Sequence, residues 1–197
     1  MNISKLRTHA NINSPEFPAN KVRLLYAGRL YYSKGVLQLL GILADLSKEQ
    51  GTRNFTLSIF GAGPLERGLR KYANRYLPEG TFTIRGQVDH GILVHELMNC
   101  DVVCFPSLYE ACPLLMIEAM SLAKPVLAFD LPFAREMLGN LGELLASDGN
   151  DFRGKLARLT SSKDMRDNLS RKLLARSKRF DADKIAGEYR EVYEEMM

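Results

Sequence analysis

The sequence lacks the long apolar run that a membrane-spanning helix requires. No stretch reaches the roughly 18 to 20 consecutive apolar residues of such a helix, and the opening MNISKLRTHANINSPEFPAN carries no signal-peptide pattern. With 46% hydrophobic and 25% charged residues among 197, the composition is that of an ordinary globular protein. We therefore expect a cytoplasmic protein in which residues 21–197 form one domain and residues 1–20 form a lead-in or linker.

Histidine and cysteine are scarce, and neither is arranged to bind a metal. The three cysteines, Cys100, Cys104 and Cys112, lack the spacing of a zinc site. His90 and His95 do not have the i, i+4 spacing of a helical zinc pair. The cysteines lie on or beside an apolar segment, so we expect buried, reduced thiols, as in the cytoplasm. No metal site and no other cofactor is predicted.

Acidic residues are outnumbered, with a formal net charge of +4, and much of the positive surplus lies near the C-terminus. The run RKLLARSKR, residues 171–179, is explained either as a solvated helix face or as a surface for an anionic partner. Such a partner could be a lipid headgroup surface, which would place the protein at the periphery of the inner membrane, or a phosphate-bearing substrate. The basic residues are not interleaved with aromatics, so no nucleic-acid partner is expected.

Short apolar runs alternate with stretches of helical periodicity from residue 22 onward. Runs without polar alternation are typical of strands covered on both faces, and strand–helix alternation predicts parallel strands with right-handed crossovers. We therefore predict an α/β fold with a doubly wound, Rossmann-like sheet, followed by helices from about residue 151. The expected strands span residues 22–28, 55–61, 81–86, 101–106, 125–130 and 142–146. The expected helices span residues 34–50, 65–76, 90–99, 113–122, 134–138, 165–177 and 185–196, with a further one around 156–159.

Ligands of such sheets bind beyond the carboxyl ends of the strands, which directs attention to the segments that follow them. After the first strand, GRLYYSKG brings Arg29 and Lys34 to the start of a helix, where two cations and free amides can bind a diphosphate. Taken alone, both could be ordinary surface charges. After the second strand, GAGP offers Gly61 and Gly63, which suit the close approach of a ligand or a plain strand-to-helix turn. Glu66 in the sixth position means that this segment is no G-x-G-x-x-G fingerprint.

The segment after the fourth strand, PSLYEACPLLMIEAM, carries two carboxylates. Glu110 lies in the loop, and Glu118 lies about one and a half turns into the next helix, so both can point toward the same mouth. Between them, the first-turn amides of Leu114 and Leu115 can bind phosphate. Carboxylates suit sugar hydroxyls, so a nucleoside diphosphate sugar is the predicted ligand. The alternative is that Glu118 balances the helix dipole and Glu110 is a loop charge.

The order GRLYYSKG, GAGP, RGQVDH and DVVCFPSLYEACPLLMIEAMSLAKPVLAFD resembles the C-terminal domain of family 4 retaining glycosyltransferases, which have the GT-B fold. The motifs run from about Val22 to Asp130, and the layout continues to Met197. The most specific element is the E-x7-E pair, Glu110 and Glu118.

The resemblance implies a role for each site residue. Arg29 and Lys34 would hold the diphosphate and stabilise the leaving group in place of a metal ion, and Glu110 would bind donor-sugar hydroxyls beside the reacting carbon. Glu118 would accept hydrogen bonds from the ribose hydroxyls. The backbone around Gln87 and Val88 would pair with the base edge, and the amides of Leu114 and Leu115 would bind the distal phosphate. The residues implied in donor binding are therefore Gly28, Gly61, Gly63, Gln87, Val88, Leu114, Leu115 and Glu118.

The sequence departs from the family in two ways. Ala111 and Pro113 stand where the family often has a glycine and a small residue, which predicts a stiffer loop with one amide donor fewer. Family members are also roughly twice as long, with an N-terminal acceptor-binding domain across which their last helix packs. The resemblance therefore implies that this chain needs such a domain or a partner chain to transfer a hexose from a UDP-, GDP- or ADP-linked sugar. The resemblance also implies a role in polysaccharide or glycolipid biosynthesis, with a cell-envelope polysaccharide or a glycolipid as the acceptor.

The final helix is expected to expose an apolar face, made of Ile185, Tyr189, Val192, Tyr193 and Met196. A homodimer through this face or through the exposed cleft is therefore an alternative to the missing domain. Two other functions stay open: a non-catalytic nucleotide-sugar-binding module that regulates a partner, and an α/β enzyme such as a sugar-nucleotide epimerase. The absence of a G-x-G-x-x-G after the first strand argues against a dinucleotide-dependent oxidoreductase.

Overall fold

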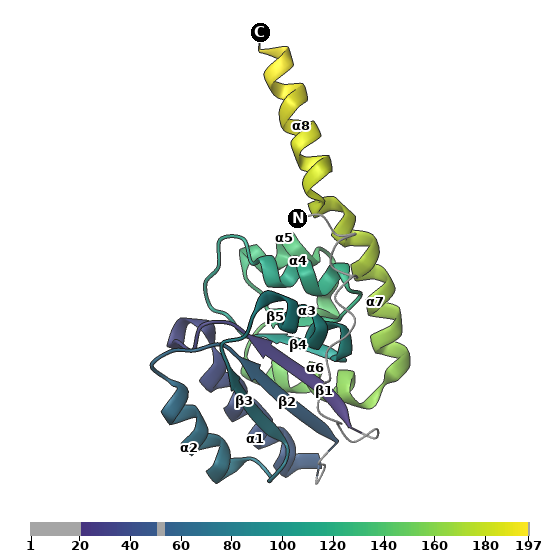
Figure 1. Ribbon diagram of the computed structural model, residues 1–197. Coiled ribbons are helices and arrows are strands. Elements are labelled where there is room, and N and C mark those ends of the chain that lie inside the picture. The colour runs from purple at the N-terminus through teal and green to yellow at the C-terminus, as the bar shows by residue number, and fades with distance from the viewer. Residues whose placement is uncertain (1–20, 51–53, 197) are drawn as a thin grey trace.

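A parallel sheet forms the centre of the molecule in the computed structural model, which describes residues 21–50 and 54–196 (Figure 1). The lead-in expected at residues 1–20 lies outside the described residues. Within them, the sheet has six strands in the order β3-β2-β1-β4-β5-β6. Every neighbouring pair is parallel, so the predicted doubly wound α/β sheet is confirmed. The strands are β1 (Val22–Ala27), β2 (Phe55–Phe60), β3 (Phe82–Gly86), β4 (Val102–Phe105), β5 (Val126–Phe129) and β6 (Leu145–Ala146).

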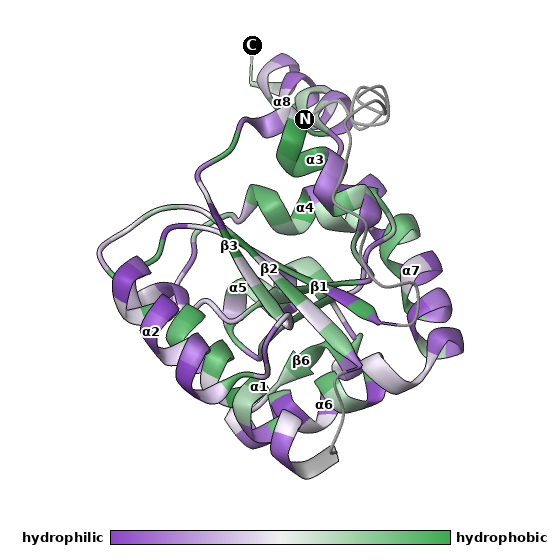
Figure 2. Cartoon of the chain, turned by 60° about the horizontal axis from the view of Figure 1, so that its bottom comes forward, coloured by the Kyte–Doolittle hydropathy of each residue, from purple (hydrophilic) through white to green (hydrophobic). Residues whose placement is uncertain are grey.

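Helices cover both faces of the sheet, which is why β4 and β5 are apolar and buried along their length. The edge strand β3 instead alternates, with Thr83 and Arg85 exposed. On one face α1 packs against α2 and α6, and on the other face α4 packs against α7 while α3 contacts β1 (Figure 1). In Figure 2 the central strands are mostly green, whereas α2 alternates between purple and green because one of its sides faces solvent. The helices are α1 (Val36–Gln50), α2 (Glu66–Tyr76), α3 (His90–Asn99), α4 (Leu114–Ser121), α5 (Pro132–Leu138), α6 (Gly149–Ser161), α7 (Lys163–Ser177) and α8 (Ala182–Glu195).

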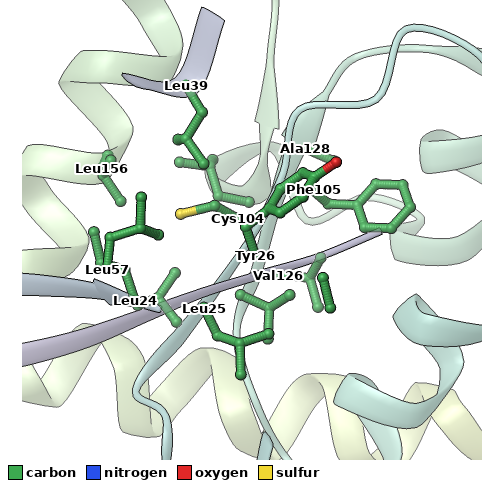
Figure 3. Packing of buried hydrophobic residues seen from close by; sticks show 14 of the residues in the cluster. Leu24, Leu25, Tyr26, Leu39, Leu57, Cys104, Phe105, Val126, Ala128 and Leu156 are labelled. Carbon is green, nitrogen blue, oxygen red and sulfur yellow. The ribbon is translucent and has the colours of Figure 1, made fainter. Parts of the chain in front are cut away.

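Side chains from the strands and the covering helices fill the core. Leu24 and Leu57 of neighbouring strands, Leu39 of α1 and Leu156 of α6 are almost fully buried in one cluster (Figure 3). Each buried leucine of this kind contributes about 1.5 to 3 kcal/mol to folding. Cys104 belongs to the same core, as the sequence predicted, and burial raises its thiol pKa.

The cysteines divide into two environments. Cys100 is buried, and burial raises the pKa of its thiol to about 12. The expectation that all three cysteines are buried is wrong for Cys112, which is exposed in the loop before α4. The apolar segments on either side belong to β4 and α4, but the loop that joins them lies at the surface.

Four helices, α5 to α8, begin before the residue that the sequence predicted, and local features explain two of these starts. α5 begins at Pro132 instead of residue 134, because proline fits the first helical position, where no amide partner is needed. α6 begins at Gly149 instead of residue 151, because the side chain of Asp148 caps it by accepting from the Asp151 amide at 2.9 Å. A proline therefore sets the start of α5, and a side-chain cap sets the start of α6.

The basic run near the C-terminus is partly structural. The Arg176 guanidinium in α7 donates to the carbonyl oxygens of Met137, at 2.5 Å, and Glu136, at 2.6 Å, at the C-terminal end of α5. A cation at that end satisfies carbonyls that the helix leaves unpaired. Arg171 and Lys172 are exposed to solvent.

The last helix, α8, extends away from the rest of the molecule (Figure 1). Of the predicted apolar face, Tyr189, Val192, Tyr193 and the C-cap residue Met196 are exposed, whereas Ile185 is partly buried. A short 3-10 helix, η4 (Lys178–Phe180), joins α8 to α7. Within the described part of the chain, no helix combines the length and the apolar character needed to cross a bilayer.

Candidate functional site

An open pocket lies at the point where the strand order of the sheet reverses. The chain leaves β1 toward β2 on one side, while β4 pairs with β1 on the other, so the loops after β1 and β4 meet at the carboxyl ends of the strands. The pocket has a volume of about 380 Å³, in the range of a small-molecule site. It is lined by Tyr26, Ala27, Gly28, Arg29, Lys34, Phe105, Ser107, Glu110, Cys112, Pro113, Leu114 and Leu115.

The centre of the pocket is an ion pair between the two loops. The Lys34 ammonium donates to Glu110 Oε1 at 2.6 Å, and the side chains are only 14% and 19% exposed. Lys34 ends the 3-10 helix η2 (Tyr32–Lys34), and Glu110 lies in the loop before α4. The sequence predicted both residues for one site but did not predict that they pair. A cation and a carboxylate in contact can bind phosphate and sugar hydroxyls side by side.

The two loops are held together by a close backbone contact. The Leu108 amide donates to the Ser33 carbonyl at 2.9 Å. Gly35 follows η2 with a φ of 66°, and a Cβ on it would lie 2.0 Å from the Pro106 carbonyl oxygen. Only glycine fits that approach and that backbone conformation. The contact between Lys34 and Glu110 therefore depends on a glycine between the loops.

Gly61 and Gly63 support the same region from the loop after β2. A Cβ on Gly61 would lie 2.0 Å from the Gly28 carbonyl oxygen, and one on Gly63 would lie 2.6 Å from that of Leu30. The Leu30 amide donates to Ala62 at 3.0 Å. The glycines thus let two loops pack closely, and their contact with a donor stays a prediction.

Arg29 and Tyr26 line the pocket near β1. Arg29 is exposed, and its guanidinium carbon lies 5.8 Å from the centre of the Tyr31 ring. The buried Tyr26 hydroxyl donates to the Arg29 carbonyl at 3.1 Å. Burial raises the pKa of Tyr26, and the negative charge of Glu110 adds to that shift. Tyr26 was not predicted from sequence, because within an apolar strand nothing marks a tyrosine as lining a site.

The start of α4 closes the other side of the pocket. Leu114 and Leu115 occupy the first turn of α4, after Pro113 in extended conformation. First-turn amides of a helix have no partner within the helix, and the helix dipole makes this end attractive to anions. The structure thus brings the predicted phosphate-binding amides to the pocket that contains Lys34.

Glu118 lies one turn further along α4, outside the pocket lining, and has a different partner. Its Oε1 lies 2.8 Å from Nε2 of His90, the first residue of α3. The Glu118 side chain is 9% exposed and the His90 side chain 59%. The side chains of Glu110 and Glu118 therefore have different partners, although both lie in the segment that follows the carboxyl end of β4. His90 was missed from sequence as a site residue, although it follows the strand-end segment RGQV.

Gln87 and Val88 come just before His90. Gln87 is exposed, and Val88 is partly buried against the core. The bond from His90 to Glu118 joins α4 to this segment, so the residues predicted to contact the base and the ribose are neighbours. Among the residues that the structure describes, no three His, Cys, Asp or Glu side chains are grouped so as to hold a metal ion.

Comparisons with known proteins identify the family. Residues 8–174 match the family described as glycosyl transferases group 1. The chain belongs to this family. It is similar to the glycogen synthase of Mycobacterium tuberculosis, with 32% identity over 121 residues that cover 61% of this chain and 27% of that protein. It is also similar to the amylovoran biosynthesis glycosyltransferase AmsD of Erwinia amylovora, with 28% identity over 174 residues, 86% of this chain and 48% of that protein. The chain thus spans between about a quarter and a half of these relatives.

Solved structures confirm the fold. Sucrose-phosphate synthase from Thermosynechococcus elongatus superposes with a TM-score of 0.78 at 24% identity, over 91% of this chain and 46% of that one. The Anabaena protein HepE, solved with UDP, gives 0.77 at 21% identity, over 90% and 50%. The catalytic domain of the Helicobacter pylori cholesterol-α-glucosyltransferase gives 0.71 at 19% identity, over 81% and 98%. This group 1 domain therefore has the Rossmann-like fold of the C-terminal half of GT-B glycosyltransferases, as the resemblance implied.

Proposed function

We propose that this group 1 domain binds a nucleoside diphosphate sugar and acts as the donor-binding half of a retaining hexosyltransferase. The observation that carries the proposal is the Lys34–Glu110 pair, which faces the start of α4 across one pocket. The pocket offers cations and helix amides for phosphates and a carboxylate for sugar hydroxyls. A ligand that carries both phosphates and a sugar can bind the cations, the helix amides and the carboxylate at once.

In the proposed reaction, the bond between the anomeric carbon and the diphosphate oxygen breaks and its electron pair leaves with the diphosphate. Lys34 and Arg29 stabilise this developing negative charge, which is stronger in the transition state than in the bound donor. The two side chains supply positive charge at the place where other enzymes use a metal ion. Glu110 orients the sugar and Glu118 binds the ribose. The acceptor hydroxyl oxygen forms the new bond on the same face of the sugar, and its proton passes to the departing diphosphate.

UDP is the first nucleotide to test. The similar Anabaena protein was solved with UDP, and the pneumococcal O-GlcNAc transferase GtfA, also similar in fold, was solved with UDP and GlcNAc. GDP and ADP remain alternatives because the proposed contacts at Gln87 and Val88 use backbone groups, which do not by themselves select one base.

Transfer also needs an acceptor beside the donor, because bringing two reactants together in fixed geometry is a large part of catalysis. We propose that an acceptor-binding domain or partner chain supplies that half and covers the apolar face of α8, Tyr189, Val192, Tyr193 and Met196. A second copy of this chain is the alternative occupant of α8. The exposed Arg171 and Lys172 would suit an acceptor held at an anionic membrane surface.

Calorimetric titration with UDP, GDP and ADP in the absence of added metal tests the proposal. We expect saturable binding of one of them, weakened in Lys34→Ala by about 1 to 3 kcal/mol through loss of a charge-assisted contact. Lys48→Ala is the matched control, because Lys48 is an exposed lysine on α1 that pairs with Asp45, remote from the pocket. Binding that is unchanged in Lys34→Ala, or absent for all three nucleotides, contradicts a donor site at this pocket.

A further inference from the structure

The contact between His90 and Glu118 joins two helices that the sequence separates by 28 positions. His90 is the first residue of α3 and Glu118 lies in the middle of α4. The Nε2 to Oε1 distance of 2.8 Å is that of a good hydrogen bond. The exposed fractions of the two side chains, 59% and 9%, show that an open imidazole contacts a carboxylate that is largely shielded from water.

This bond constrains the carboxylate without using up its capacity to bind. An ionised carboxylate accepts hydrogen bonds and donates none, so the shared hydrogen sits on Nε2 of His90. A carboxylate offers about four lone-pair sites, so one bond from His90 leaves sites for ligand hydroxyls. Glutamate has three rotatable side-chain bonds, and fixing its end before a ligand arrives lowers the entropy lost on binding.

We propose that His90 is a positioning residue that holds the Glu118 carboxylate for a ribose, and so sets the preference of the site for ribonucleotides over 2′-deoxyribonucleotides. The proposal rests on the proposed donor site and adds to it the residue that orients its ribose end. Gln87 and Val88, predicted to contact the base, lie directly before His90. The beginning of α3 would therefore place the base and, through Glu118, the ribose.

The test compares dissociation constants for UDP, GDP and ADP with those for their 2′-deoxy counterparts. For the nucleotide that the unaltered chain binds, we expect the deoxy form to bind about tenfold or more weakly, because one hydrogen bond to a charged group is lost. In His90→Ala the ratio of the two dissociation constants, deoxy form over ribo form, should fall to about threefold or less. A Glu118 carboxylate that is no longer held in place forms a weaker hydrogen bond with the 2′-hydroxyl. Thermal melting of each variant measures folding separately from the ratio.

Two further variants make the test specific. In His90→Gln the amide nitrogen can reach the place of Nε2 and donate to Glu118, so this variant should restore most of the ratio. Asp89→Asn is the matched control, because Asp89 is exposed and its side chain makes no capping hydrogen bond to α3. It should leave the ratio unchanged.

The outcomes separate this inference from the proposed function. If the unaltered chain binds a ribonucleotide but His90→Ala keeps the full ratio, the role of His90 is wrong and the donor site stands. A His90→Gln variant that behaves like His90→Ala also contradicts positioning by a hydrogen bond. If none of the ribonucleotides binds the unaltered chain, the proposed donor site falls and the role of His90 falls with it.

Discussion

Glu110 and Glu118 belong to the same loop-and-helix segment, yet the structure holds them in different ways. Glu110 lies in the loop between β4 and α4, and its partner Lys34 comes from another loop, after β1. Glu118 lies inside α4, and its partner His90 begins α3. The position of Glu110 therefore depends on the packing of two loops. The helix sets the backbone position of Glu118, and His90 contacts its carboxylate.

The difference bears on what each carboxylate can do. A diphosphate bound to Lys34, as proposed above, would share or replace the contact with Glu110 and so change the surroundings of this carboxylate. Glu118 can accept ligand hydroxyls while it keeps the bond from His90. Glu110, the carboxylate proposed to lie near the reacting carbon, is thus the one whose partner Lys34 would also contact the donor. The carboxylate proposed to hold the ribose stays fixed.

The largest expected effect comes from breaking the loop contact on which Glu110 depends. In Gly35→Ala the new methyl group would lie 2.0 Å from the Pro106 carbonyl oxygen, at a φ of 66°. We expect the free energy of unfolding to fall by about 2 to 4 kcal/mol, through a steric clash and a strained backbone. Urea denaturation followed by circular dichroism measures the change.

Gly154→Ala is the control for this substitution. Gly154 lies within α6, and a Cβ there would have no neighbour within 4 Å. Alanine in a helix is favoured over glycine by about 1 kcal/mol, so stability should be unchanged or slightly raised. Equal effects of the two substitutions would contradict the claim that Gly35 holds the loops together.

The fold could be predicted from the sequence because it rests on local patterns. The apolar runs of β1, β2, β4 and β5 and the periodic stretches between them are long enough to identify each element. The predictions were wrong where a single residue decides the local structure. Asp148 caps α6 and so sets its first residue. Cys112 lies in a surface loop and is exposed, although the segments on either side of the loop are apolar.

The site could be predicted only in part, for a related reason. The sheet brings strand ends together, so Arg29, Lys34, Glu110 and the start of α4 were expected in one place, and they line one pocket. Which side chains pair is set by distances between loops far apart in the sequence. The bond from Lys34 to Glu110 spans 76 positions, and no local pattern encodes it.

The second prediction separates the two carboxylates by the part of the donor that each binds. Glu118→Gln should weaken binding of the nucleoside diphosphate alone by about 1.5 to 3 kcal/mol, because a charged acceptor for ribose hydroxyls is lost. Glu110→Gln should leave that binding unchanged or stronger, since it removes a negative charge beside Lys34.

Titration with the matching nucleotide sugar completes the comparison. The gain in affinity that the sugar provides over the bare diphosphate should shrink in Glu110→Gln and persist in Glu118→Gln. If both variants lose affinity for the bare diphosphate to the same extent, the division of roles between the carboxylates is wrong.

The smallest expected effect comes from removing a hydrogen bond to the loop that follows β1. Tyr26→Phe removes the hydroxyl that donates to the Arg29 carbonyl at 3.1 Å while it keeps the buried ring. We expect a loss of about 1 kcal/mol in the free energy of unfolding at neutral pH, the usual net worth of one hydrogen bond. Tyr76→Phe, at a partly exposed tyrosine of α2, is the control and should change stability by less.

The pH dependence of this loss provides a second check. Burial, with the charge of Glu110 adding to it, raises the pKa of Tyr26 in the folded chain above its ordinary value of 10.0. Above pH 10 the unfolded chain therefore releases a proton that the folded chain retains, so the contribution of Tyr26 to stability falls as pH rises. Phenylalanine has no such proton, and the difference in stability between the Tyr26→Phe variant and the unaltered chain should narrow above pH 10. A constant difference in stability across this range would mean that the Tyr26 hydroxyl is not shielded from water in the folded chain.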